Sequence, residues 1–288
     1  MAATLKLIYE TAKVRLGVLI MACVFASIAM SPGEALAASQ LLVIGLATLA
    51  AASAAGAFNQ YYERDVDARM QRTQSRPFVT GRFEANGLWL SAILVALLVS
   101  VAAMALATNW LAAAFLLLGA FTYGVVYTVW LKRRTWLNIV IGGLSGSFAV
   151  MVGSAAMGAA LSPAPLVLAV VLFLWTPPHF WALAYACRHD YEAAGIPMLP
   201  VVSRDRIATL AILLHVLVLV PLSLVPYAFV MGEVYLAGAL TGGAFFMVCS
   251  VRLHRQPTIP LAWRTFAASI VQLGLLLVAA VVDRLVAG

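Results

Sequence analysis

The chain has 288 residues, of which 64% are hydrophobic and only 10% are charged, and its mean hydropathy is +1.00. A water-soluble domain normally has about a quarter of its residues charged. The composition therefore excludes that class and predicts an all-α integral membrane protein. The net charge of +7 does not indicate nucleic-acid binding, because such binding needs a basic face on a soluble domain.

Apolar stretches long enough to cross the roughly 30 Å hydrocarbon layer as helices fill most of the chain. The segments between them on the outer side are short and almost uncharged. We therefore expect a single polytopic membrane domain over residues 1–288 with nine transmembrane helices. The predicted spans are 14–30, 36–58, 88–107, 110–131, 136–157, 165–186, 207–230, 234–251 and 262–282.

The basic residues predict how the chain is oriented. With the N-terminus in the cytoplasm, every Lys and Arg except Arg284 falls on the cytoplasmic side, as the positive-inside rule requires. No signal- or transit-peptide pattern precedes the first span, so we expect a bacterial inner (cytoplasmic) membrane and a C-terminus outside. The two longest loops, about 59–86 and 187–206, then face the cytoplasm. We expect the active site on these loops and the adjoining helix ends.

The first of these loops begins with a stripe of oxygen-bearing side chains. Asn59, Glu63 and Asp67 recur every four residues, so on a helix they lie within a stripe about 80° wide. Such ligands suit Mg²⁺, which proteins usually bind through one or two carboxylates and substrate phosphates. Asp65 points to another face unless the helix unwinds. The alternative is a solvated loop in which flanking arginines balance the carboxylates.

A second acidic cluster follows the sixth span. Asp190, Glu192 and Asp205 lie in a segment where Pro197 and Pro200 interrupt regular helix. Both clusters are on the same predicted side of the membrane. If they face one another, they could bind metal ions across a single diphosphate, with basic side chains neutralising its charge. The alternative is an ordinary amphipathic connector.

Several motifs in order resemble the UbiA superfamily of intramembrane prenyltransferases, and within it the protoheme IX farnesyltransferase (heme O synthase) branch. The stripe of Asn59, Glu63 and Asp67 is similar to the first acidic motif of that superfamily, with Glu63 where Asp is more usual. The resemblance is detailed over residues 59–200 and extends to the nine-span layout. The other matching segments are 70–77 (MQRTQSRP), 127–138, 175–184 (WTPPHFWALA) and 190–200 (DYEAAGIPMLP).

The resemblance implies a helical bundle around a central cavity that opens to the cytoplasmic side. It implies that farnesyl diphosphate is ionised with Mg²⁺ as cofactor. The farnesyl group then joins a vinyl carbon of heme B, and water completes a hydroxyethylfarnesyl side chain to give heme O. Heme B is then a substrate, the lipid bilayer is the setting, and a heme A synthase or terminal oxidase is a candidate partner. The residues expected to catalyse and bind metal are Asn59, Glu63, Asp67 and Asp190, with Asp65 as a further metal ligand. Those expected to bind diphosphate are Arg72, Arg76, Tyr127, Lys132 and Arg188.

Heme also needs a contact, and the spans contain two histidines. His179 follows Pro177 and Pro178 in the sixth span, where a polar side chain is costly unless it is used. We expect His179 to contact heme, with His215 in the seventh span as a weaker candidate. The alternative for His179 is a packing histidine bonded to a carbonyl that the prolines leave free.

Two other functions stay open on the sequence alone. One is a UbiA-type enzyme that prenylates an aromatic or quinone precursor. The other is a secondary transporter or a non-catalytic assembly factor, in which the acidic residues would be coupling or docking groups. Transporters usually place ionisable residues near the bilayer midplane, whereas the acidic residues here lie at predicted membrane boundaries.

Overall fold

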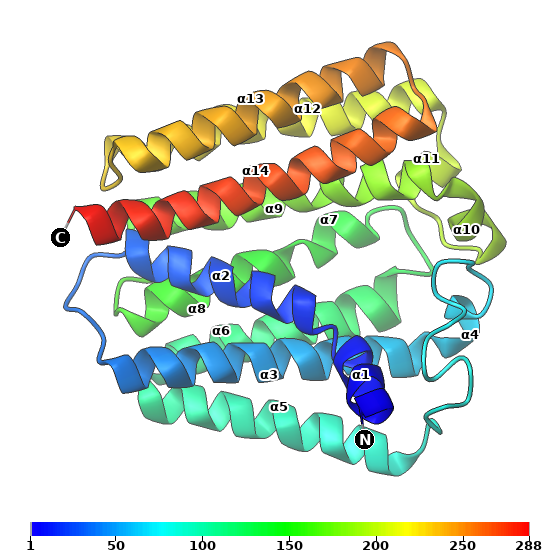
Figure 1. The fold of residues 1–288 in the computed structure, drawn as a ribbon, viewed down its shortest axis with the longest axis horizontal. Coiled ribbons are helices and arrows are strands. Elements are labelled where there is room, and N and C mark those ends of the chain that lie inside the picture. Colours follow the sequence, from blue (N-terminus) through cyan, green and yellow to red (C-terminus); the bar gives the residue numbers. More distant parts are fainter. Residues whose placement is uncertain (1, 288) are drawn as a thin grey trace.

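The computed structural model describes residues 2–287, and within them all the regular elements are helices (Figure 1). Most of these helices are long and run side by side. In chain order they are α1 (Ala2–Thr11), α2 (Val14–Met30), α3 (Ala38–Tyr62), α4 (Arg64–Asp67), α5 (Gly87–Ala107), α6 (Trp110–Phe121), η1 (Thr122–Leu131), α7 (Asn138–Gly142), α8 (Leu144–Ala156), α9 (Pro163–Ala186), α10 (Arg188–Ala193), α11 (Leu199–Val202), α12 (Asp205–Leu224), η2 (Val225–Ala228), α13 (Glu233–Arg255) and α14 (Ile259–Val286).

The predicted spans are found in the described part of the chain. Eight helical segments are long and apolar enough to cross a membrane, and α2 is a shorter apolar helix. Three spans are composite: α6 continues into η1, α7 into α8, and α12 into η2. The prediction of an all-helical membrane protein with nine transmembrane helices is confirmed.

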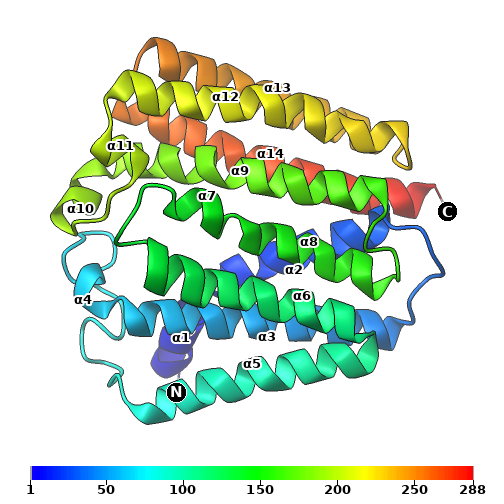
Figure 2. The same ribbon diagram turned by 180° about the vertical axis from the view of Figure 1, so that it is seen from behind.

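The long helices surround a common interior. On one side α13 packs against α12 and α14, and α9 packs against both of these. On the other side α3 packs against α2 and α5, and α6 against α5 and α8. Contacts of α2 with α14 and of α8 with α9 join the two sides. Figures 1 and 2 show α4, α10 and α11 at one end of the bundle and the C-terminus at the opposite end. The two long loops therefore lie at the same end.

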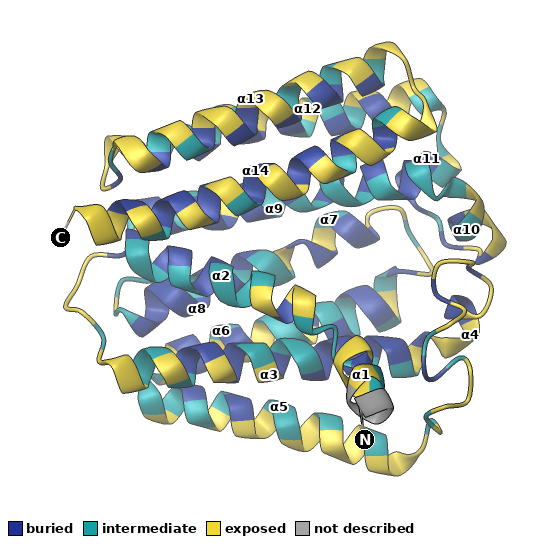
Figure 3. Cartoon of the chain, viewed as in Figure 1, coloured by how far each residue is buried: buried dark blue, intermediate teal, exposed yellow. Residues whose placement is uncertain are grey.

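The distribution of side chains is that of a protein in lipid. Large apolar residues face outward, as along α5, where Leu94, Leu98 and Leu106 are exposed (Figure 3). Small residues lie where helices meet and let their backbones approach closely. Gly153 of α8 shows this, because a Cβ atom there would overlap the carbonyl oxygen of Val24 in α2.

An apolar cavity lies inside the bundle, and the space in it that no protein atom fills, together with adjoining open solvent, is about 1140 Å³. Residues of α2, α3, α6, η1, α7, α8 and α9 form its walls, together with Leu273 of α14. The cavity reaches Tyr123 and Tyr127 toward the end that carries α4. Its far end is formed by residues of three helices, Cys23 of α2, Thr48 of α3 and Val152 of α8. The bundle therefore has the central cavity that the sequence led us to expect.

Candidate active site

The oxygen-bearing stripe lies on one buried face where α3 passes into α4. Glu63 separates the two helices with φ −91° and ψ 8°, a small departure from helical geometry that keeps the four-residue spacing in phase. The exposed fractions of Asn59, Glu63 and Asp67 are only 2%, 1% and 1%. Buried ionisable groups at a membrane boundary are costly unless they are paired or bound to a ligand.

Asn59 and Glu63 are joined to the helix η1 by hydrogen bonds and an ion pair. The Nδ2 atom of Asn59 donates to Glu63 Oε2 at 2.9 Å and to Thr128 Oγ1 at 3.0 Å. Lys132 pairs with the same Glu63 oxygen. The other carboxylate oxygen, Oε1, is buried and has no hydrogen-bond partner among the described residues. One charged oxygen is therefore left without a partner inside the cluster.

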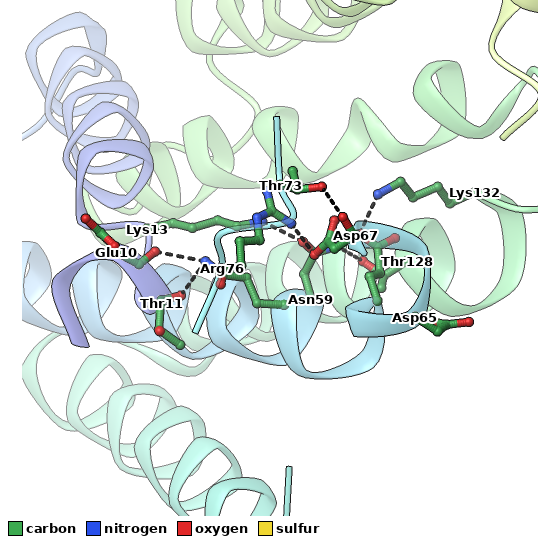
Figure 4. A network of polar contacts seen from close by, with 12 residues as sticks. Glu10, Thr11, Lys13, Asn59, Asp65, Asp67, Thr73, Arg76, Thr128 and Lys132 are labelled. Atoms are coloured by element: carbon green, nitrogen blue, oxygen red, sulfur yellow. Dashed lines mark hydrogen bonds and ion pairs between the residues drawn. The ribbon is translucent and has the colours of Figure 1, made fainter. Parts of the chain in front are cut away.

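The loop after α4 folds back over Asp67. Arg76 Nη1 lies 2.5 Å from Asp67 Oδ2, and the hydroxyl of Thr73 donates to the Asp67 carbonyl at 2.9 Å. Figure 4 shows Arg76, Asp67, Asn59 and Lys132 turned toward one another, with Asp65 pointing away from them. The structure thus brings Arg76 and Lys132, two of the residues expected to bind diphosphate, to the carboxylates.

Lys13 enters the same cluster from the start of α2. Its Nζ donates to Asn59 Oδ1 at 2.5 Å and to the Tyr123 hydroxyl at 3.0 Å. Burial, together with the positive charges of Arg76 and Lys132, lowers the pKa of Lys13 to about 7. Both hydrogen-bond acceptors of Lys13 are neutral groups, and the cations Arg76 and Lys132 lie nearby.

The winding of η1 places its polar residues on the face toward α3. It is a π-helix, in which hydrogen bonds join residues five apart. Tyr123 and Lys132 are nine residues apart, so a regular α-helix would place them about 180° apart. The π-helical register lets both reach the cluster, Tyr123 through Lys13 and Lys132 through Glu63. Tyr127 stacks on Tyr123 with ring centroids 5.8 Å apart, and both line the cavity.

Asp65, expected as a further metal ligand, does not join the cluster. Because α4 stays helical, its side chain faces outward and makes a bidentate pair with Arg133 at 2.7 and 2.8 Å. The hydrogen bonds from Arg133 hold the pKa of Asp65 below its ordinary value. The helix does not unwind there, so Asp65 stays on a different face from the stripe.

The second acidic cluster lies close to the first loop, but its side chains are engaged elsewhere. Asp190 accepts the backbone N–H groups of Gln71 and Arg72 at 3.1 and 3.3 Å, which places the exposed Arg72 at the rim of the site. Arg188, expected to bind diphosphate, pairs instead with Asp205 at 2.6 Å. The expected arrangement of two acidic centres facing one another is thus not formed by the side chains as they lie.

The two histidines expected to contact heme are packed between helices. The ring of His179 lies between Trp175 and Phe266, with ring centroids 4.2 and 4.6 Å away, and its Nδ1 is 2.7 Å from Ser269 Oγ. His215 Nδ1 lies 2.8 Å from the carbonyl oxygen of Ala211. Neither histidine is among the residues that line the cavity. The packing alternative accounts for the contacts of His179, except that its partner is a hydroxyl rather than a freed carbonyl.

The residues at the stripe fit a hard divalent cation. Glu63 offers a buried free oxygen, and Asn59 Oδ1 already accepts from a cationic group. Within residues 2–287, no three His, Cys, Asp or Glu side chains are arranged to hold a metal by themselves. Mg²⁺ usually keeps several waters and takes one or two carboxylates together with substrate phosphates.

Sequence reasoning missed three members of this cluster: Lys13, Tyr123 and Thr128. In the sequence, Lys13 is one of the basic residues before the first span that indicate the orientation of the chain. No local pattern links it to Asn59. Tyr123 and Thr128 lie close in sequence to Tyr127, which begins the segment 127–138 that resembles the UbiA superfamily. The signal that could have found them is the polar character of Tyr123, Tyr127, Thr128 and Lys132 at spacings of four and five.

Comparison with known proteins identifies the family of the chain. A family model described as the UbiA prenyltransferase family matches residues 19–276. The chain belongs to the UbiA prenyltransferase family. It is 50% identical over 288 residues to Protoheme IX farnesyltransferase 2 of Paramagnetospirillum magneticum, with 100% of both chains covered. It is 40% identical over 294 residues to the Protoheme IX farnesyltransferase of Rhizobium etli, with 97% of this chain and 89% of the relative covered.

Solved structures share the UbiA fold. A structure of digeranylgeranylglyceryl phosphate synthase has a TM-score of 0.79 at 16% identity, covering 97% of this chain and 98% of that one. A UbiA homolog from Archaeoglobus fulgidus, described as bound to GPP and Mg²⁺, has a TM-score of 0.63 at 14% identity, covering 93% and 99%. The expected UbiA-type helical bundle is confirmed.

Proposed function

We propose that this UbiA family member transfers the farnesyl group of farnesyl diphosphate to a vinyl group of heme B and releases diphosphate. Water then adds to the carbocation left on the former vinyl group, and loss of a proton gives the hydroxyethylfarnesyl side chain of heme O. The relatives named protoheme IX farnesyltransferase, at 40–50% identity over nearly the whole chain, support this reaction and these substrates. The structural observation that carries the proposal is the buried set of Asn59, Glu63 and Asp67 beside the end of an apolar cavity that Tyr123 and Tyr127 line. This is the arrangement that an apolar tail with a charged diphosphate head requires.

A divalent cation, Mg²⁺ in the proposal, would be held by Glu63, Asp67 and Asn59. It would neutralise charge on the departing diphosphate. The Archaeoglobus homolog described with GPP and Mg²⁺ supports such an ion in this fold. Asp190 lies against the same loop and is proposed as a further ligand once its backbone contacts are released.

The basic residues around the stripe would bind the diphosphate. Lys132 and Arg76 already lie against Glu63 and Asp67, and Arg72 lies at the rim. Charge on the leaving group increases as the carbon–oxygen bond breaks, so these cations stabilise the transition state more than the bound substrate. Tyr127 lines the cavity beside Lys132, whose Nζ lies 5.7 Å from its ring centroid. We propose that Tyr127 hydrogen-bonds the diphosphate, and that Arg188 binds it when released from Asp205.

The apolar walls of the cavity would surround the prenyl tail and keep water away from the allylic cation. The position of heme is not specified by His179 or His215, because neither lines this cavity. Both remain proposals as heme contacts, with His179 the nearer in sequence to the cavity residues Trp175, Thr176 and Phe180.

The chain is proposed to form one polytopic domain of a bacterial inner membrane, with the active-site end in the cytoplasm and the C-terminus outside. The concentration of Lys and Arg at the active-site end supports this orientation, and so does the position of the C-terminus at the other end (Figure 1). A heme A synthase or a terminal oxidase would consume the product and is the expected partner.

The direct test uses the purified full chain in detergent or nanodiscs with heme B, farnesyl diphosphate and Mg²⁺. Mass spectrometry should detect heme O, and chelation of the metal should prevent its formation. If the protein instead prenylates a hydroxybenzoate or naphthoate and leaves heme B unchanged, the substrate assignment is wrong.

A further inference from the structure

Lys13 is held in the cluster by contacts between α3 and the segment that joins α1 to α2. Its backbone has φ 48° and ψ 43°, and among the described residues it is the only non-glycine with positive φ. Residues with side chains rarely adopt this conformation. Gly56 of α3 makes room for it, since a Cβ there would lie 3.3 Å from Lys13 Cβ and 3.4 Å from the Ala12 carbonyl oxygen. Gln60, one turn later, donates to the Glu10 carbonyl at 2.8 Å.

The face of α3 that holds Lys13 also carries the proposed metal ligands. Gly56, Asn59, Gln60 and Glu63 fall within about 100° of one another on an α-helix. The strained backbone at Lys13 is thus fixed by the same two turns of α3, from Gly56 to Glu63, that place Asn59 and Glu63. Strain of this kind persists only where the surrounding structure imposes it, and it often accompanies function.

The contacts of Lys13 differ from those of the other two cations. Arg76 pairs with Asp67 and Lys132 with Glu63. Within residues 2–287 Lys13 has no carboxylate partner and donates only to Asn59 Oδ1 and the Tyr123 hydroxyl. When Lys13 is protonated, three cations face two carboxylates, and no carboxylate of the described residues is paired with its charge. An enclosed excess charge favours an anionic ligand.

The hydrogen bond from Lys13 to Asn59 Oδ1 indicates that an anionic ligand would bind together with the metal ion. Asn59 Oδ1 is the amide oxygen that a metal ion would take, and the ammonium occupies it with one of its three donors. A metal ion that binds Asn59 displaces this hydrogen bond and adds two more positive charges. A diphosphate that enters with the metal would offset the two added positive charges. Its oxygens would also accept hydrogen bonds from the Lys13 ammonium in place of the bond lost to Asn59.

We propose that Lys13 is a further catalytic residue of the transfer site, one that contacts the diphosphate. Its ammonium holds Asn59 Oδ1 while the metal is absent, and passes to a diphosphate oxygen when metal and diphosphate bind. This inference rests on the proposed function, because it requires a metal-bound diphosphate at this stripe. Metal and diphosphate then bind with positive coupling, each strengthening the other.

The test measures binding without prenyl transfer, on the full chain in nanodiscs without heme. The probes are Mn²⁺, followed by electron paramagnetic resonance, and inorganic diphosphate, followed by calorimetry at saturating Mn²⁺. The variants are Lys13→Met and Lys13→Arg. The matched control is Lys6→Met, which removes an exposed lysine of α1. Gel filtration and thermal unfolding establish that each variant is folded.

In Lys13→Met we expect Mn²⁺ alone to bind at least as tightly as in the wild type, because a competing cation is gone. The affinity for diphosphate should fall by about tenfold or more, the usual effect of losing one charge-assisted hydrogen bond. Lys13→Arg should recover most of that affinity, and Lys6→Met should change neither constant.

Weaker Mn²⁺ binding by folded Lys13→Met in the absence of diphosphate would overturn the proposal, since it would make Lys13 a support of the metal site. Unchanged diphosphate affinity would overturn it as well. A wild-type protein that binds neither probe would contradict the proposed function together with this inference. A wild-type protein that binds both but makes no heme O would contradict only the substrate assignment.

Discussion

The side-chain amide of Asn59 in α3 donates a hydrogen bond to the hydroxyl oxygen of Thr128 in η1 at 3.0 Å. The same hydroxyl donates to the carbonyl of Tyr123 at 2.8 Å, five residues earlier in the π-helix. Thr128 is fully buried. One hydroxyl thus joins the π-helix to the stripe that carries the proposed metal ligands.

Replacing Thr128 by Val should therefore impair the reaction. The variant keeps the shape but leaves the Asn59 amide with one donor unpaired, at a cost of about 1–3 kcal/mol. We expect kcat/KM for heme O formation to fall about 10- to 100-fold. Thr128→Ser retains the hydroxyl and should stay within a few-fold of the wild type. Equal activity of the Val and Ser variants would contradict a role for this hydrogen bond.

Asp67→Asn should abolish turnover while leaving a folded protein in the membrane. The substitution removes a buried carboxylate that lies 2.5 Å from Arg76 and is proposed to bind metal. We expect a loss larger than the roughly 100-fold upper range seen for outer-shell partners of metals. Heme O formation and gel filtration of the same preparation measure both properties. Full activity in Asp67→Asn would remove the metal assignment.

Asp65→Asn provides the matched control for Asp67→Asn. Asp65 is two residues away, but its side chain is 54% exposed and pairs with Arg133 outside the cluster. Exposed pairs of this kind contribute little, so we expect activity within about threefold of the wild type. A loss comparable to that of Asp67→Asn would return Asp65 to the metal set.

The Asp65–Arg133 pair also predicts a pH dependence of stability. The pKa of Asp65 lies below its ordinary value of 3.8 in the folded protein, so the pair stabilises the fold when pH exceeds 3.8. The contribution is lost as pH falls through the lowered pKa. Thermal unfolding of wild type and Asp65→Asn should differ by a small constant amount above about pH 5. The difference should shrink as pH falls below 3.8 and disappear once pH is below the lowered pKa of the folded protein. A difference that grows on acidification would contradict this pairing.

The far end of the cavity should limit the length of the prenyl tail. From Thr48 to Asn59, α3 rises about 16 Å, so a tail anchored at the stripe extends toward Cys23, Thr48 and Val152. Val152→Phe fills this end. In competition assays we expect use of farnesyl diphosphate to fall several-fold relative to geranyl diphosphate, consistent with an overpacking cost of about 1–3 kcal/mol.

The control for that experiment is Val99→Phe, which enlarges a residue that is 62% exposed on α5 and should leave the product ratio unchanged. If Val152→Phe is folded and also keeps the wild-type ratio, the tail does not reach this end of the cavity.

The transmembrane layout was readable from the sequence because long apolar runs have few alternatives in a membrane. The predicted segment 110–131 is reproduced as Trp110–Leu131. Its division into α6 and the π-helix η1 was not predicted, since α- and π-winding differ in hydrogen-bond register and have no distinct composition. The orientation of Tyr123 and Lys132 followed from that register and was missed with it.

The oxygen-bearing stripe could be found because four-residue spacing converts directly into a helical face, and α3 and α4 stay nearly in phase. The ion-pair partners of the charged residues in and around the stripe could not be predicted. Arg188 pairs with Asp205, and Asp65 pairs with Arg133. These pairings depend on which helix ends lie close together in the fold. Lys13 reaches Asn59 across 46 positions through a backbone conformation that its residue type disfavours.

The contact of Asp190 with the loop after α4 makes two backbone amides informative. Its carboxylate accepts the N–H groups of Gln71 and Arg72, 119 and 118 positions away in the chain. Amide hydrogens exchange with solvent only when such bonds open. If Asp190 turns to bind a metal ion, both amides lose their acceptor, and their exchange should accelerate as metal and diphosphate are added. Two exchange rates on one loop would then report the occupancy of the site by a carboxylate on another helix.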